Sequence, residues 1–110
     1  MTKYLISFPS AALADEDLRA ASDDSHKVVQ EAKDAGVWVF GGGIDESVPP
    51  VLVYGDGTVS AGTYPESRLD GGFAVLELPY QEAALEWAAK LAAACHCAQE
   101  VRAFHYDPAS

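Results

Sequence analysis

Cysteine and long apolar runs are scarce in this sequence of 110 residues. Its two cysteines, Cys95 and Cys97, are too few and too close together for the disulfide framework of a small secreted domain. We therefore expect a reducing, cytoplasmic location. No segment approaches the roughly 18 apolar residues of a membrane-spanning helix, so we expect no membrane insertion.

Basic side chains are also scarce. Seven Lys and Arg residues stand against 17 Asp and Glu residues, which gives a formal net charge of −10 at pH 7. The basic residues are scattered along the chain and form no cluster. Such a surface repels the phosphate backbone of nucleic acids and anionic lipid headgroups. The sequence therefore predicts neither a nucleic-acid partner nor a membrane partner.

The composition is typical of one folded domain. Hydrophobic residues make up 49% of the chain and charged residues 22%, which is too apolar for a disordered segment. The length suits a single core, and no internal repeat or low-complexity linker divides the chain. We predict one domain over residues 1–110.

The order of the expected elements indicates an α+β fold. Apolar residues recur at helical spacing over 15–35, where Gly36 ends the helix, and over 80–94. Runs of β-favouring residues predict strands at 3–8, 37–40, 51–54, 58–60, 72–78 and 101–106. The segment 55–57, Gly-Asp-Gly, joins the strands 51–54 and 58–60 into a hairpin. We predict a ferredoxin-like βαβ(ββ)βαβ sheet with two helices on one face.

Both faces of the predicted sheet are apolar. In the strand 72–78, Phe73 and Val75 point to one face of the sheet and Ala74 to the other. In the strand 37–40, simple alternation puts Trp38 and Phe40 together on one face. Two helices cover only one face, so the other would leave large apolar side chains in water. A second copy of the chain is the simplest cover. We therefore predict a homodimer joined through its sheets.

Short segments spread over nearly the whole chain carry a family resemblance. They are 3–6, 35–36, 41–44, 56–57, 70–73, 82–88 and 100–102. In this order and spacing the chain resembles the YCII-related superfamily, in its DGPF-domain branch. The name-giving Asp-Gly-Pro-Phe segment would fall at 61–64, of which only Gly62 matches. The resemblance implies a dimeric α/β barrel with a cleft near the sheet and the first helix.

The resemblance also implies a chemistry. A few YCII-like proteins are similar to small lyases, such as dehydrochlorinases of hydroxylated aromatics, that use a histidine paired with an aspartate. His26 stands at their first-helix histidine, whereas Leu91 stands where the second-helix aspartate would be. Asp70, Glu66 or Glu77 could replace that aspartate. The expected activity is that of a lyase or isomerase on a small organic molecule, and the alternative is a non-catalytic module that binds a small ligand or a protein.

The position of His26 is compatible with either role. It lies about 60° outside the apolar stripe of its helix, at the border between core and solvent. From there it could reach a cleft as a general acid or base, or be a solvated surface residue. We take His26 and Asp70 as the candidate catalytic residues. The candidate substrate-binding residues are Trp38, Tyr64, Glu66 and Arg68. The last three share a polar loop that either rims a small-molecule pocket or is only a solvated loop.

Three further patterns have both a structural and a functional interpretation. Glu77, inside an apolar strand, is either a desolvated carboxylate or an ion-pair partner of Arg102. The segment 95–97, Cys-His-Cys, has zinc-ligand residue types but no fourth ligand, so we expect no metal. The glycines at 41–43 fit no phosphate-binding motif, and we expect them to give backbone freedom at a strand end. No cofactor is predicted.

Overall fold

The computed structural model describes residues 1–14 and 18–110, and it has the predicted α+β class. Its elements are β1 (Thr2–Phe8), the 3-10 helix η1 (Ser10–Ala12), α1 (Leu18–Asp34), β2 (Trp38–Gly43), β3 (Val51–Val53), β4 (Val59–Ala61), β5 (Gly72–Leu78), α2 (Gln81–Cys95) and β6 (Glu100–Ala103). The expected helix start at 15–17 lies outside the described residues. Two predicted strand ends were wrong by three residues. β2 continues to Gly43 because its glycines pair with β5, and β6 ends at Ala103, the last residue of its pairing with β1.

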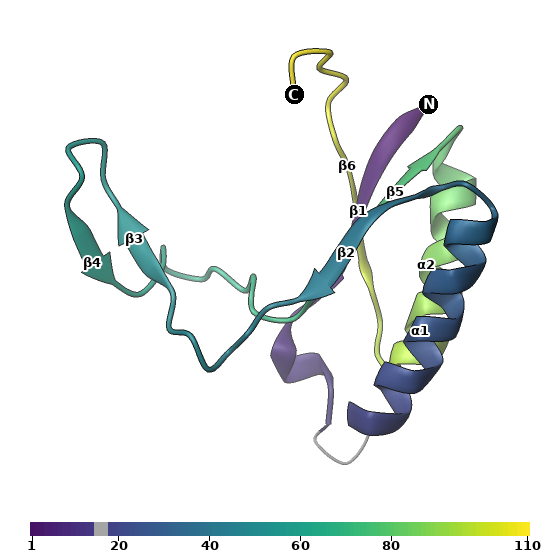
Figure 1. Cartoon of the computed structure of the whole chain (residues 1–110), viewed down its shortest axis with the longest axis horizontal. Helices are drawn as coiled ribbons and strands as arrows, with labels where there is room; N and C mark the ends of the chain where they lie inside the picture. The colour runs from purple at the N-terminus through teal and green to yellow at the C-terminus, as the bar shows by residue number, and fades with distance from the viewer. Residues whose placement is uncertain (15–17) are drawn as a thin grey trace.

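Four strands form one antiparallel sheet in the order β2-β5-β1-β6, and the β3–β4 hairpin forms a separate two-stranded sheet. Both helices lie on one face of the larger sheet (Figure 1). The buried cluster comes from that face and from the helices: Tyr4, Ile6, Ala32, Ala74, Leu76, Leu78, Ala84, Ala88 and Leu91. Its helical members are mostly alanines, which let the helices approach the sheet closely.

The end of α1 is as predicted. Gly36 has φ +74°, and its N–H donates to the Lys33 carbonyl at 3.0 Å. The N–H of Val37 donates to the Ala32 carbonyl at 3.1 Å. This arrangement satisfies the last carbonyls of the helix and turns the chain directly into β2.

A bulge in β2 decides which of its side chains face the helices. Trp38 pairs with Leu76 and Phe40 with Val75, so Val39 is an extra residue in the ladder. Trp38 therefore shares the helix-covered face with Leu76, whereas Phe40 shares the open face with Val75. The prediction that Trp38 and Phe40 lie on the same face was wrong, because alternation fails at a bulge.

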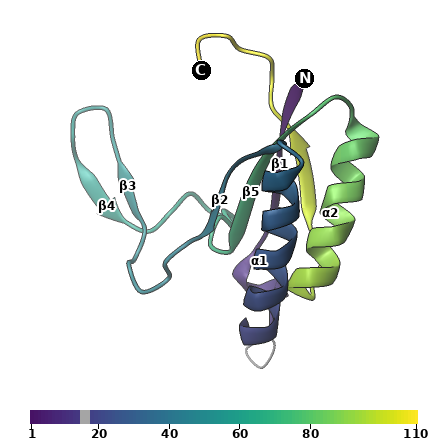
Figure 2. The ribbon, with the colours of Figure 1, turned by 45° about the vertical axis from the view of Figure 1, so that its right-hand side comes forward.

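The face of the sheet without helices is apolar, as the sequence indicated. Leu5, Phe73 and Val75 are only partly buried there, and Phe40 is 65% exposed. The β3–β4 hairpin projects from the domain on the side away from the helices (Figures 1 and 2). Its strands expose further apolar side chains, those of Val51, Val53 and Val59.

The hairpin turn lies at the predicted residues. Gly57 adopts φ +88°, and the N–H of Tyr54 donates to the Thr58 carbonyl at 2.8 Å. The Asp56 carboxylate accepts a hydrogen bond from the Thr58 N–H at 2.8 Å. Among the described helices, neither combines the length and the apolar character needed to cross a bilayer.

Candidate functional site

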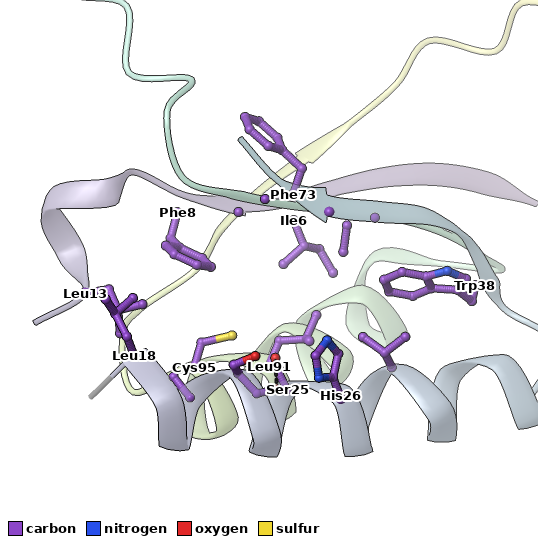
Figure 3. A pocket seen from close by; sticks show the side chains of 18 of the residues that line it. Ile6, Phe8, Leu13, Leu18, Ser25, His26, Trp38, Phe73, Leu91 and Cys95 are labelled. Atoms are coloured by element: carbon purple, nitrogen blue, oxygen red, sulfur yellow. Dashed lines mark hydrogen bonds between the residues drawn. The ribbon is translucent and has the colours of Figure 1, made fainter. Parts of the chain in front are cut away.

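A cavity of about 510 Å³ lies between α1 and the β2–β5 half of the sheet (Figure 3). Its walls include Phe8 of β1, Leu13 of the following loop, Trp38 of β2 and Leu91 of α2. A mostly apolar cavity of this size suits a small organic molecule. We take it as the candidate functional site.

The floor of the cavity combines glycines with one aliphatic side chain. Gly41, Gly43, Gly72 and Ala74 line it together with Ile6. A Cβ on Gly41 would collide with the Trp38 ring, and one on Gly72 would come within 2.5 Å of Phe8 Cε1. The two aromatic rings therefore lie partly over glycines, toward opposite ends of the floor, and the Ile6 side chain lies between them (Figure 3). The result is an apolar surface bounded by two rings, which fits an apolar ligand.

Helix α1 supplies most of the described polar groups of the cavity. Ser22, Ser25, His26 and Lys33 line it on that side. Figure 3 shows the His26 ring pointing from the helix into the cavity, and the Ser25 hydroxyl donates to the Ser22 carbonyl at 3.0 Å. The sequence placed His26 at the border between core and solvent. It is an exposed residue that lines the cavity.

Asp70, the second candidate catalytic residue, has a different neighbour. One carboxylate oxygen accepts from the Ser10 N–H at 3.1 Å and the other from the Ser10 hydroxyl at 2.9 Å. These hydrogen bonds hold the pKa of Asp70 below its usual value. Asp70 thus anchors the turn that leads to Leu13, and it is not among the described residues that line the cavity. The structure does not bring Asp70 and His26 together.

The candidate substrate-binding residues divide into two groups. Trp38 lines the cavity. Tyr64, Glu66 and Arg68 lie in the loop before β5, where all three are exposed and none lines the cavity. Tyr64 is 77% exposed, and the Arg68 guanidinium donates to the neighbouring Ser67 carbonyl at 3.0 Å.

Glu77 lies in an ion pair, but with a partner other than the expected one. Its carboxylate is 3.2 Å from the Lys3 ammonium on the neighbouring strand. Arg102 pairs with Glu100 at 3.3 Å. Both pairs are well exposed, so each contributes little to stability.

The two cysteines are free thiols, and Cys95 is 7% exposed at the back of the cavity. Burial, with a smaller contribution from the neighbouring Cys97, raises the pKa of Cys95 to about 11. The thiolate is the nucleophilic form of cysteine, so Cys95 is a poor nucleophile at neutral pH. The described residues contain no group of three or more His, Cys, Asp and Glu side chains that could hold a metal ion.

We expect the buried Cys95 thiol to make stability fall with alkaline pH. The pKa of the thiol is raised from 9.0 to about 11. Its contribution to the free energy of unfolding is therefore complete below pH 9 and is lost as pH rises toward 11. The difference in free energy of unfolding between wild type and Cys95→Ala, measured in urea, should therefore shrink over this interval. At pH 6–8 the difference should stay constant. If the free energies of unfolding of the two proteins change in parallel from about pH 7 to 11, the raised pKa of Cys95 is contradicted.

Two features of the site escaped the sequence analysis. Lys33 stands seven residues after His26, two helical turns along nearly the same stripe of α1, and this spacing could have revealed it. Phe8 could not have been found, because its place depends on the approach of β1 to Gly72.

No protein-family model matches the chain, and no curated protein matches its sequence. Membership of the YCII-related superfamily therefore stays a prediction from the segments that carry the resemblance.

Proposed function

We propose that this protein is a small enzyme of the YCII-related type, a lyase or isomerase that acts on a small organic molecule in the cavity beneath α1. The observation that carries the proposal is His26, whose imidazole points into an apolar cavity of about 510 Å³ (Figure 3). Imidazole is the side chain best suited to moving protons near neutral pH. The glycine-lined floor would hold the substrate beneath it.

The chemistry needs only one proton-transfer group at the start. A nitrogen of His26 takes a proton from a substrate carbon, so that the C–H bond breaks and an N–H bond forms. The electron pair of the C–H bond then forms a double bond and expels a leaving group as an anion, which is elimination. Alternatively the imidazolium returns the proton to another carbon, which is isomerisation.

Replacing His26 by alanine should reduce turnover by about 100-fold or more, because general acid–base catalysis contributes this much. Suitable substrates are a panel of halogenated hydroxyaromatics, followed by halide release, and of enolisable cyclic esters, followed by deuterium uptake from solvent. His105→Ala is the matched control, since His105 is exposed and does not line the cavity. Equal turnover in wild type and His26→Ala would reject the proton-transfer role.

A second candidate function is a non-catalytic module that binds a small ligand or a protein. It is favoured by the surroundings of His26: no hydrogen bond or ion pair joins its imidazole to a carboxylate among residues 1–14 and 18–110. A general base without such an orienting group is a weaker catalyst. Binding of panel compounds without turnover, retained in His26→Ala, would support this function over the first.

We also propose that the functional unit is a homodimer. A compact monomer of 11.7 kDa exposes roughly 5,900 Å², whereas this chain exposes 7613 Å². The excess of about 1,700 Å² is twice what each partner buries in a standard interface. The radius of gyration, 15.3 Å, likewise exceeds the roughly 13 Å of a compact chain of this length.

A second copy suits the open face of the sheet because that face is nearly neutral. Its charges occur as the pairs Lys3–Glu77 and Arg102–Glu100. Strands β3 and β4, Val51–Val53 and Val59–Ala61, carry no charge at all. Two chains of net charge −10 could therefore approach through this side without strong repulsion.

The finer fold assignment belongs to the same proposal. Omitting the hairpin, the chain runs β1-α1-β2-β5-α2-β6, and the sheet order β2-β5-β1-β6 supports a ferredoxin-like arrangement. Pairing of two such sheets would make the dimeric α/β barrel that the resemblance implies. The free thiols of Cys95 and Cys97 support a cytoplasmic location.

A further inference from the structure

We infer that the cavity takes a small, largely apolar organic acid, whose anionic group is bound by Lys33. The inference rests on the proposed function in taking this cavity as the ligand site, and it adds the charge and polarity of the ligand. It follows from three features of the cavity: the charges that line it, the freedom of Lys33, and the shape of the floor.

The lining of the cavity contains cations but no described carboxylate. Among the described residues its ionisable groups are those of His26, Lys33 and Cys95, and the Cys95 thiol is neutral because its pKa is raised to about 11. This selection is unusual in a chain with 17 acidic and seven basic residues. An amine would find no counter-ion in the described lining, whereas a carboxylate or sulfonate would find one in Lys33.

Lys33 is available to bind a ligand. Lys3, Lys27, Lys90 and Arg102 each lie within 4.0 Å of a carboxylate, whereas Lys33 forms no ion pair with any described residue. The carbonyls of the last turn of α1 would otherwise repel an anion. Those of Ala32 and Lys33 itself already accept hydrogen bonds from Val37 and Gly36. The exposed Lys33 ammonium therefore sets the charge at this end of the cavity.

The floor restricts the size of the ligand. Glycines 41, 43 and 72 line it together with Ile6, and the Phe8 and Trp38 rings stand at its two ends (Figure 3). His26 and Lys33 lie about 10 Å apart along α1, with Val29 between them. A small apolar ligand on the floor can thus place an acidic group near Lys33 while its carbon atoms lie beneath His26.

Two fluorescent probes of nearly equal shape separate charge from shape. Anilinonaphthalene sulfonate is an aromatic anion, and N-phenylnaphthylamine is its uncharged relative. We expect Lys33→Met to weaken binding of the sulfonate about five- to tenfold and to leave the neutral probe unchanged. Lys27→Met is the matched control, because Lys27 lies on the same helix, pairs with Asp24 and does not line the cavity.

A variant that fills the cavity shows where the probes bind. A Cβ on Gly43 would face the cavity with its nearest neighbour 3.9 Å away, so Gly43→Val should fold and should displace both probes. Gly55→Val, in the hairpin turn, outside the described lining and with no atom within 4 Å of its Cβ, should displace neither.

The outcomes distinguish the two proposals. If Gly43→Val displaces both probes but Lys33→Met leaves sulfonate binding within twofold, the anion inference is wrong and the cavity remains the ligand site. If Gly43→Val affects neither probe, the cavity is not the binding site, and both the inference and the proposed function fail.

Discussion

Replacing Gly71 by alanine should lower the free energy of unfolding by about 3 kcal/mol, the upper end of the usual cost of overpacking. A Cβ at this position would collide with the Phe8 carbonyl oxygen and lie 2.8 Å from the Pro9 carbonyl carbon. These are backbone atoms, which cannot rotate away as a side chain can. The same strand end holds the Phe8 ring in the wall of the cavity, so Gly71→Ala should also weaken probe binding.

Gly42→Ala is the control for this substitution. A Cβ on Gly42 would meet no atom within 4 Å, and alanine in a strand is more stable than glycine by roughly 0.5–1 kcal/mol. Urea unfolding, monitored by circular dichroism, gives the free energy of unfolding of both variants. A Gly71→Ala protein within 0.5 kcal/mol of wild type would contradict the close approach of β1 to Gly71, since overpacking should cost about 1–3 kcal/mol.

Introducing Asp at Phe40 should convert the proposed dimer into a monomer. Phe40 is 65% exposed on the open face, so the single chain should tolerate a polar side chain there. In a twofold dimer the substitution occurs twice. Losing the burial of two phenyl rings costs roughly 3–6 kcal/mol, which raises the dissociation constant by at least about 100-fold.

Sedimentation equilibrium over a range of concentrations measures this effect. Wild type should have twice the chain mass of 11.7 kDa, and Phe40→Asp should have the mass of one chain with an unchanged circular dichroism spectrum. Leu85→Asp is the control, because Leu85 is 49% exposed on α2, which packs against the other face. A wild-type mass of one chain at every concentration would reject the dimer.

The sequence predicted part of the candidate site. His26 and Trp38 both line the cavity, because helical spacing and a strand next to glycines are local signals. Asp70 was assigned to the same site, yet it binds Ser10, which is 60 residues away in sequence. Spacing along the chain does not report such a contact.

The sequence by itself determined the α+β class, the helix end at Gly36, the hairpin turn and the apolar character of both sheet faces. Each depends on neighbouring residues: a glycine at a left-handed position, a period of side chains, or a strand composition. Only the tertiary structure decided the rest. The bulge at Val39 separated Trp38 from Phe40, and the close packing of rings over glycines shaped the floor of the cavity. Those features depend on which strands lie side by side, and sterics between residues distant in sequence determine that.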